Sequence, residues 1–503
     1  MKFLKNTFIF SIATLISRVL GYLRDAVVAY YFGANPATDA FYVAWRLPNT
    51  LRQLVAEGSF NAAFIPIYTQ EYSKSPENAK WYASSLFTYY TIVLIVLTLL
   101  VIIFAPYFVK IIAPGFANKG NFDLTVELVR WIFPYLILIG WTSFYMALLN
   151  TKDRFFIPAV APALLNLAFV ITSVILSYSM GIYSLAVGAL LGGFLQLIIQ
   201  FPLAIKEGLI VKPTFTIHPE IKTTLKKLGP AFLSFGVSQF AFVIDTVLAS
   251  FLIAGAVTYL YYGNRIFQLP LGVFIIGLGN ALLVSLSKNY ANKDFETFRK
   301  DLTLSLKFSI FISMPATIGM IFLGKEIIDV LLVRGAFNEK DAQLTYYALI
   351  GYGLGLLGYS LTRPFKSAFF AMGDTKTPLY STMIGIIASI ISAVVLTFIL
   401  NFGVFGLAFA SSLGGYINTI YLYKHFKMKI DLKEIFKTFI KVSIAGFVMI
   451  LFIEALKLFV FNKFIVVFVG ILISGVAYLF VNYLLKEDTT ILFVNIVRRK
   501  LKA

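Results

Sequence analysis

Charged side chains interrupt the apolar segments near the start of this chain. The stretch LISRVLGYLRDAVVAYYFG, residues 15–33, contains Arg18, Arg24 and Asp25. On a helix, residues seven apart point in nearly the same direction, so Arg18 and Asp25 share a face and can pair. A charge near the centre of a bilayer costs on the order of 3 kcal/mol, and it is by default a sign of a functional site.

The second apolar segment repeats this pattern. Asp39 and Arg46 are again seven residues apart, and Arg52 and Glu57 follow after Pro48, which can kink the helix. Pairing at these spacings would neutralise the charges. It would not explain why they are present, because apolar packing in place of a buried ion pair is often neutral or stabilising.

The second half of the chain supplies two more charged residues in apolar surroundings. Asp245 stands alone in its segment, and Arg265 lies in YYGNRIFQLP. Arg24 and Arg265 have no obvious carboxylate neighbour in the sequence, so facing helices would bring net positive charge into a central cavity. A guanidinium group binds phosphate with two parallel hydrogen bonds. The pattern therefore predicts a site for a phosphate-bearing amphiphile.

The sequence gives little evidence for a nucleotide-binding, metal-binding or catalytic site. Gly353, Gly355 and Gly358 match the spacing of a dinucleotide-binding loop, but they lie within an apolar helical segment, where close helix packing explains them better. The sequence contains no HExxH, GxSxG or P-loop motif and no cysteine. Its two histidines, His218 and His425, lie in polar connections. We expect no cofactor and no metal centre, and we expect a protein that is not an enzyme.

The elements that must position these residues are membrane-spanning helices. The chain has 503 residues, of which 59% are hydrophobic and 13% are charged, whereas a soluble protein has about 25% charged residues. Apolar runs long enough to span recur throughout, which predicts an all-α polytopic membrane protein. The fourteen expected spans are 6–32, 38–70, 82–108, 123–150, 156–179, 182–205, 228–254, 257–288, 302–323, 342–371, 377–400, 403–423, 435–460 and 463–485.

The formal net charge is +19, and the Lys and Arg residues are concentrated on one side of the predicted membrane, since the longer connections on the other side, near Lys110–Lys119 and Lys325–Lys340, are only mildly basic. Alternate connections are rich in Lys and Arg, as in YSKSPENAK and VRRKLKA, whereas GANPA, SMGIY, AGAV and NFG contain neither. Basic residues collect in cytoplasmic loops, so both termini are expected in the cytoplasm. We also expect the apolar N-terminal segment to remain as the first span, and we expect no nucleic-acid partner.

Two parts of the chain resemble each other. GIYSLAVGALLGG at 181–193 matches GVFGLAFASSLGG at 403–415, an offset of 222, and Arg46 matches Arg265 at an offset of 219. Six spans per repeat keep both halves in the same orientation, an arrangement found in transporters. We therefore predict an N-terminal lobe at 1–210, a C-terminal lobe at 211–430, and two extra helices with a basic tail at 431–503.

Several of these segments resemble the MurJ/MviN lipid II flippases of the multidrug/oligosaccharidyl-lipid/polysaccharide exporter superfamily. The resemblance covers nearly the whole chain, and it is carried by SRVLGYLRD, ATDAFYVAWRLPNTLRQLVAEGSFNAAFIPIY, APGFA, NTKDRFFIPAVAPALLN and YYGNRIFQLPLGV. It implies a bacterial inner-membrane transporter, most simply a monomer, that moves lipid II, a polyprenyl-pyrophosphate glycopeptide, to the periplasmic leaflet by alternating access.

The resemblance also implies roles for individual residues. Cavity arginines of the family match Arg18, Arg24, Arg52 and Arg265, and its acidic positions match Asp25, Asp39 and Glu57. We expect Arg18, Arg24, Asp25, Arg52 and Arg265 to bind substrate, with Asp39, Arg46 and Glu57 in support. The two extra helices of the family form a groove for the lipid tail.

Energy coupling is left open by the sequence. Some family members are proposed to bind Na⁺ between spans 7 and 11, where Asp245 is the carboxylate of span 7 in this chain. Span 11 contains no Asp or Asn, and a hard cation needs several oxygen ligands. Coupling to Na⁺ is therefore disfavoured, while protons or the membrane potential remain as alternatives.

Three other functions compete with the flippase. A relative could export another polyprenyl-linked glycan, or it could export cationic drugs, which calls for a net acidic cavity rather than a basic one. A membrane-embedded transferase needs a base or metal carboxylates clustered at one face, but here the acids are dispersed. A scaffold without transport does not explain charges within the membrane.

Overall fold

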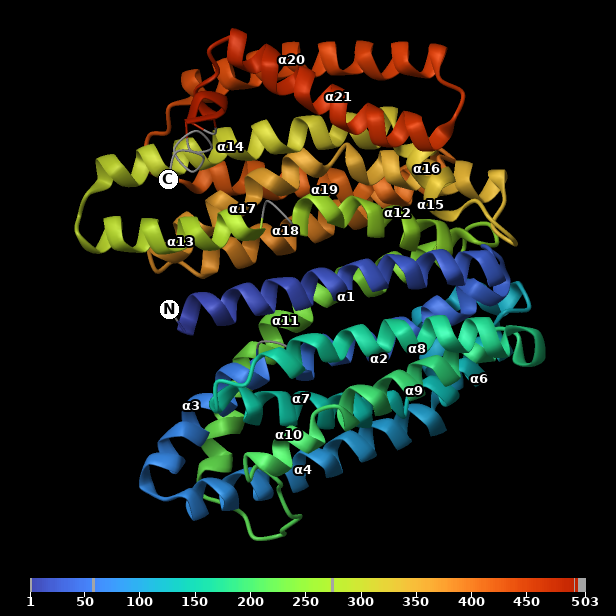
Figure 1. Cartoon of the computed structure of the whole chain (residues 1–503), viewed down its shortest axis with the longest axis vertical. Helices are drawn as coiled ribbons and strands as arrows, with labels where there is room; N and C mark the ends of the chain where they lie inside the picture. Colours follow the sequence, from blue (N-terminus) through green and yellow to red (C-terminus); the bar gives the residue numbers. More distant parts are fainter. Residues whose placement is uncertain (1, 57–58, 273–275, 493, 496–503) are drawn as a thin grey trace. The chain divides into compact units, whose positions relative to one another are not determined.

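The computed structural model describes residues 2–56, 59–272, 276–492 and 494–495, and these residues form helices joined by short connections (Figure 1). The chain divides into two compact units. The first contains Met1–Thr258 together with Arg334–Phe337, and the second contains Tyr259–Val333 and Asn338–Ala503. The predicted lobe boundaries at 210 and 430 follow the sequence repeat rather than compactness, and they stay predictions.

The helices of the first unit run from α1 to α11. Their bounds are α1 Lys2–Phe32, α2 Pro36–Ala56, α3 Ser59–Lys74, α4 Pro76–Ile103, α5 Ala105–Ile112, η1 Pro114–Asn118, α6 Phe122–Ile132, α7 Tyr135–Thr151, α8 Phe156–Met180, α9 Tyr183–Ile198, α10 Phe201–Lys206 and α11 Glu220–Ser250.

The remaining helices run from α12 to α21. Their bounds are α12 Ala256–Pro270, α13 Ile276–Ala291, α14 Phe295–Phe322, α15 Gly324–Leu332, α16 Glu339–Gly353, α17 Leu356–Ala371, α18 Lys376–Val394, the π-helical turn η3 Val395–Ile399, α19 Gly403–His425, α20 Leu432–Phe459 and α21 Lys463–Leu484.

Eight segments of the described residues are long and apolar enough to cross a membrane. They are Pro76–Ile103, Phe122–Thr151, Phe156–Met180, Tyr183–Lys206, Phe295–Phe322, Lys376–Ile399, Leu432–Phe459 and Lys463–Leu484. Five of the other six predicted spans contain charged residues, such as Arg24, Asp245 and Arg265, which lower their hydropathy. The count of fourteen and the orientation of the termini stay predictions.

The repeated glycine motif has the same local structure in both units. Gly181 and Gly403, which begin the two matching segments, both have positive φ, at 54° and 53°. A Cβ on Gly193 would lie 2.9 Å from the ring of Tyr135, and a Cβ on Gly415 would lie 3.2 Å from the ring of Tyr359. The two matching segments therefore share this local geometry, and the internal duplication stays a prediction.

Helix packing also explains the glycines that imitate a dinucleotide loop. A Cβ on Gly355 would collide with Ser412, and one on Gly358 would lie 3.0 Å from the backbone nitrogen of Tyr416. Both contacts are with α19. Small residues let helix backbones approach closely in membranes. The prediction that these glycines serve packing is confirmed.

The two C-terminal helices belong to the second unit and pack against α14. Buried Val442 and Ala445 of α20 and Val466 of α21 share a core with Ile310 and Phe311 of α14. The Tyr478 hydroxyl donates to the Phe311 carbonyl at 2.7 Å. Figure 1 shows α20 and α21 side by side, next to α14. One face of this helix pair is therefore buried against α14. Phe447 and Leu458 of α20 are exposed.

Candidate functional site

Arg24 and Asp25 of α1 form an ion pair. The Arg24 Nε and Nη2 donate to the Asp25 Oδ1 at 3.0 and 2.6 Å. The carboxylate is buried, and the Arg24 guanidinium also lies 5.6 Å from the ring centre of Phe169 on α8. The expectation that Arg24 has no carboxylate neighbour is therefore wrong, because its long side chain folds back to the adjacent residue.

Arg18 lies nearly two helical turns before this pair. Its side chain is exposed, and within the described residues no ion pair joins it to Asp25. The seven-residue spacing does bring the two onto one face, but Asp25 is bound by its sequence neighbour instead. The arrangement keeps the Arg18 guanidinium available on the surface of the first unit.

Asp39 of α2 binds a turn rather than an arginine. Its Oδ2 accepts from the Gly255 backbone nitrogen at 2.7 Å, and its Oδ1 accepts from the Thr258 nitrogen and hydroxyl at 2.9 and 2.7 Å. Asp39 is buried, and the turn it binds starts α12. A carboxylate at this position accepts hydrogen bonds from backbone nitrogens that have no partner within the helix, and its negative charge is stabilised by the helix dipole at the N-terminus of α12. The spacing that suggested an Asp39–Arg46 pair is therefore misleading.

The same turn is held by the connection before α6. The Gly115 nitrogen donates to the Ser250 hydroxyl at 3.0 Å, and the Lys119 Nζ donates to the Ser250 carbonyl at 2.7 Å and also to the Leu252 carbonyl. Burial lowers the pKa of Lys119, while the nearby Asp39 raises it in part. We refer to residues 250–258 as the outer turn, since the predicted orientation places it outside.

Arg46 of α2 faces α11. Its guanidinium lies 5.5 Å from the ring centre of Phe242, and its positive charge acts on the carboxylate of Asp245, one turn further along α11. The sequence leaves Asp245 without a partner, but the structure brings this arginine to it.

The other two predicted substrate arginines lie in different units. In the first, the Arg52 Nε donates to the Asn49 Oδ1 at 3.1 Å on α2. In the second, Arg265 is half-buried in α12. Glu57 lies outside the described residues. The convergence of arginines from both halves therefore stays a prediction.

Sequence reasoning missed two cations on α17, Arg363 and Lys366. Both lie within a predicted span, in SLTRPFKSAFF, so the rule that identified Arg18 and Arg24 also applied to them. The Lys366 Nζ donates to the Thr382 hydroxyl of α18 at 2.8 Å. These residues add two cations to Arg265 as candidate site residues of the second unit.

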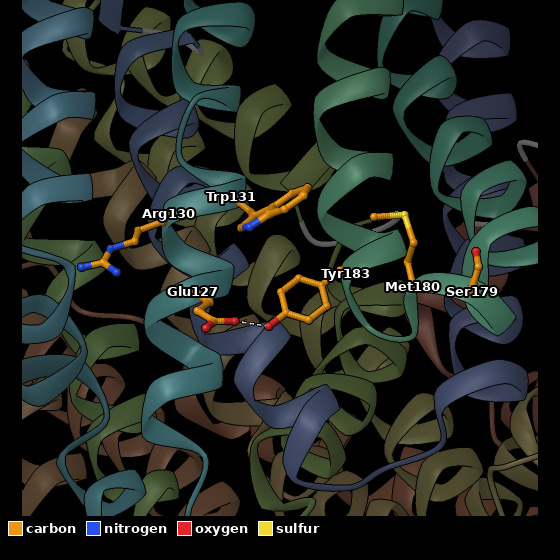
Figure 2. A pocket seen from close by; sticks show the side chains of 6 residues that line it. All are labelled: Glu127, Arg130, Trp131, Ser179, Met180 and Tyr183. Atoms are coloured by element: carbon orange, nitrogen blue, oxygen red, sulfur yellow. Dashed lines mark hydrogen bonds between the residues drawn. The ribbon is translucent and has the colours of Figure 1, made fainter.

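A separate hollow of about 650 Å³ lies in the first unit between α6, α8 and α9. Its lining residues are Glu127, Arg130, Trp131, Ser179, Met180 and Tyr183 (Figure 2). The Tyr183 hydroxyl donates to Glu127, and the Arg130 Nε donates to the Ile102 carbonyl at 3.3 Å. None of the predicted site residues lines it, and its open, aromatic walls are typical of a membrane–water interface.

The sequence matches one family over most of its length. A family model described as lipid II flippase MurJ matches residues 28–477. The probable lipid II flippase MurJ of Aquifex aeolicus is 34% identical over 496 residues, which cover 98% of this chain and 97% of that protein. The lipid II flippase MurJ of Burkholderia cenocepacia is 33% identical over 419 residues, 82% of this chain and 81% of that protein.

Solved structures give the same result. A lipid II flippase MurJ in an inward closed conformation has a TM-score of 0.83 at 30% identity, over 96% of this chain and 99% of that one. An inward-facing multidrug resistance MATE transporter of the MOP superfamily has a TM-score of 0.65 at 15% identity, over 82% of this chain and 96% of that one. The second likeness shows a shared fold.

Proposed function

Because this chain belongs to the MurJ family of lipid II flippases, we propose that it moves lipid II from the cytoplasmic to the periplasmic leaflet of the bacterial inner membrane. The observation that carries the proposal is the family match over residues 28–477, supported by a relative that is 34% identical over 98% of the chain. A multi-pass membrane protein of this family is a transporter, and we assign it no catalytic step.

The proposed substrate site uses arginines to bind the pyrophosphate. Arg24, Arg52 and Arg265 contact the phosphate oxygens, because a guanidinium fork matches them with paired hydrogen bonds. Arg18 contributes charge at the entrance, and Asp25 fixes the orientation of Arg24 through the 2.6 and 3.0 Å bonds. The polyprenyl tail stays in lipid, alongside the exposed apolar face of α20 and α21.

Alternating access is the proposed transport mechanism. The site opens to the cytoplasm while the outer turn is held by Asp39 and Lys119, and it opens outward when those bonds are released. The Asp39 bonds are well suited to this role, because a buried carboxylate with three donors holds one arrangement firmly and costs free energy to release.

We propose that Na⁺ is not required for transport. Arg46 supplies the positive charge next to Asp245, so a cation at this carboxylate would be repelled. Protons and the membrane potential remain as energy sources. Transport by purified protein in liposomes should continue when K⁺ replaces Na⁺ on both sides, and a loss of transport in K⁺ would contradict this proposal.

The main experiment tests substrate and site together. A strain depleted of its own flippase should grow when it expresses this chain, and purified protein should move labelled lipid II across liposomes. The double variant Arg24→Ala, Arg265→Ala should lose both activities. Arg299→Ala, at an exposed position near the start of α14, removes one charge as a control and should keep them. Normal activity of the double variant would refute the site.

The runner-up is export of another polyprenyl-linked glycan. The MATE likeness gives a shared fold and not a substrate, and a drug-cation exporter fits poorly with the basic residues of α1, α2 and α12. Direct competition between lipid II and other polyprenyl-pyrophosphate glycans for binding distinguishes these functions. Preferential binding of a different glycan would favour the runner-up.

A further inference from the structure

Two cations of α17 lie one turn apart, in a segment predicted to span the membrane. Lys366 is half-buried, and its Nζ donates to the Thr382 hydroxyl on α18 at 2.8 Å. Arg363 is exposed, and the base of its side chain lies against α13. A Cβ on Gly279 of α13 would lie 3.7 Å from the Arg363 Cβ. Residues three apart on a helix are neighbours on its surface, so both cationic ends can reach one ligand.

This cation pair lacks a compensating acid. Among the residues that the structure describes, no carboxylate forms an ion pair with Arg363 or Lys366, and the charge of Arg363 acts on Lys366. Two other cations of the same unit are each matched by an acid. Lys307 lies 2.5 Å from Asp488, and Lys457 lies 2.9 Å from Glu326. The α17 pair differs from these two lysines, because no acid of the described residues pairs with it.

Uncompensated positive charge within a membrane segment is costly unless it faces water or a ligand. An anionic ligand would remove the repulsion between the two cations and complete their hydrogen bonds. The available donors are the Lys366 ammonium group and the Arg363 guanidinium fork, which bind a carboxylate through charge-assisted hydrogen bonds. The Thr382 hydroxyl donates its own proton to the Pro378 carbonyl at 2.8 Å, so it positions Lys366 and does not bind the ligand.

Lys366 lies near the end of α17 that faces the cytoplasm in the predicted orientation, which is the side from which the proposed substrate enters. Lys366 precedes the end of α17 at Ala371 by five residues, about 8 Å along a helix. In the predicted orientation this end is cytoplasmic. The proposed function assigns the pyrophosphate to arginines of α1, α2 and α12, so the carboxylates of the peptide on the same head group are the anions that still need a partner.

We propose that Arg363 and Lys366, the second of them positioned by the Thr382 hydroxyl, form a subsite that binds a carboxylate of the glycopeptide head group. This inference rests on the proposed function, because it requires a peptide-bearing substrate. The subsite contributes to substrate selection, since a polyprenyl pyrophosphate without a peptide would leave it empty.

The test measures binding of three ligands to purified protein in nanodiscs of zwitterionic lipid. The ligands are lipid II, lipid II whose peptide carboxylates are converted to amides, and polyprenyl pyrophosphate. The Lys366→Met variant should bind lipid II about tenfold more weakly, in line with loss of a charge-assisted bond, and polyprenyl pyrophosphate within about twofold of the unaltered protein. The amidated lipid II should bind both proteins equally.

Two further variants separate binding from a structural role. Lys366→Arg keeps the charge and should retain most of the affinity for lipid II. Thr382→Val removes the hydroxyl but leaves both cations, so it should weaken binding less than Lys366→Met does. Lys376→Met removes an exposed charge at the start of α18 and should change nothing. Thermal unfolding of each variant provides the folding control.

The binding measurements distinguish the proposed carboxylate subsite from three other roles of Lys366. Equal loss of affinity for all three ligands assigns Lys366 to the pyrophosphate or to folding, and it overturns the inference. An effect that arises only when anionic phospholipid is added to the nanodiscs assigns the subsite to a lipid head group, which also overturns it. If the unaltered protein binds no lipid II, the proposed function fails; if it binds and Lys366→Met binds equally well, the peptide subsite alone fails.

Discussion

Single carboxylates have different roles in this protein although their sequence spacing is similar. Asp25 pairs with Arg24 at the next position, whereas Asp39 accepts three hydrogen bonds from the outer turn. Both lie seven residues from an arginine, at Arg18 and Arg46. The difference arises because a buried carboxylate binds the donors that the fold brings nearest, and for Asp39 these are backbone groups more than 200 positions away in the sequence.

Removal of the Asp39 carboxylate is expected to destabilise the protein. Asp39→Ala leaves the Gly255 and Thr258 nitrogens without an acceptor in a buried place, at a cost of about 3 kcal/mol. Thermal unfolding in detergent should show a clearly lower midpoint. Asp123→Ala, an exposed carboxylate in the first turn of α6, is the control and should have a small effect. Equal midpoints for the two variants would contradict the assigned role of Asp39.

Pairs of helices are held together by glycines that face a neighbouring helix. Gly188 and Gly192 of α9 face α8, and Gly355 and Gly358 face α19. The glycine pattern was visible in the sequence, and its packing role could be predicted from its apolar context. The partner helix could not, because a small residue indicates close approach without indicating which backbone approaches.

A larger side chain at one of these contacts should disrupt folding. Gly355→Leu would place its Cβ on Ser412, so we expect little folded protein after extraction into detergent. Gly319→Ala is the matched control within α14, since no atom lies within 4 Å of a Cβ at that position, and alanine favours a helix by about 1 kcal/mol over glycine. Size-exclusion chromatography measures the folded fraction. A normal yield of Gly355→Leu would refute the close contact.

At the scale of the whole molecule, the charge distribution predicts which connections face the cytoplasm. The basic loops and both termini are expected inside, and loops such as AGAV and NFG outside. The proposals on substrate entry and on the outer turn depend on this orientation, because they assign a cytoplasmic end to α17 and an external position to residues 250–258.

Cysteine labelling can test the orientation directly, because the chain contains no cysteine of its own. Phe461→Cys lies in the exposed connection between α20 and α21 and should react with a membrane-impermeant maleimide in intact spheroplasts. Asn292→Cys, exposed after α13, should react only once the membrane is permeabilised. The reverse pattern would place both termini outside.

The sequence by itself determined the class of protein and its helical architecture, and it predicted the internal repeat and the functional importance of the α1 and α2 charges. These features depend on composition and local periodicity, which a single chain segment contains. Only the tertiary structure decided which groups the charged side chains contact. Asp25 binds Arg24, Asp39 binds the outer turn, the charge of Arg46 acts on Asp245, and Arg363 and Lys366 have no acidic partner within the part of the chain that the structure describes. The physical reason is that hydrogen bonds and ion pairs depend on distances between helices, and spacing along one helix specifies only which face a residue occupies.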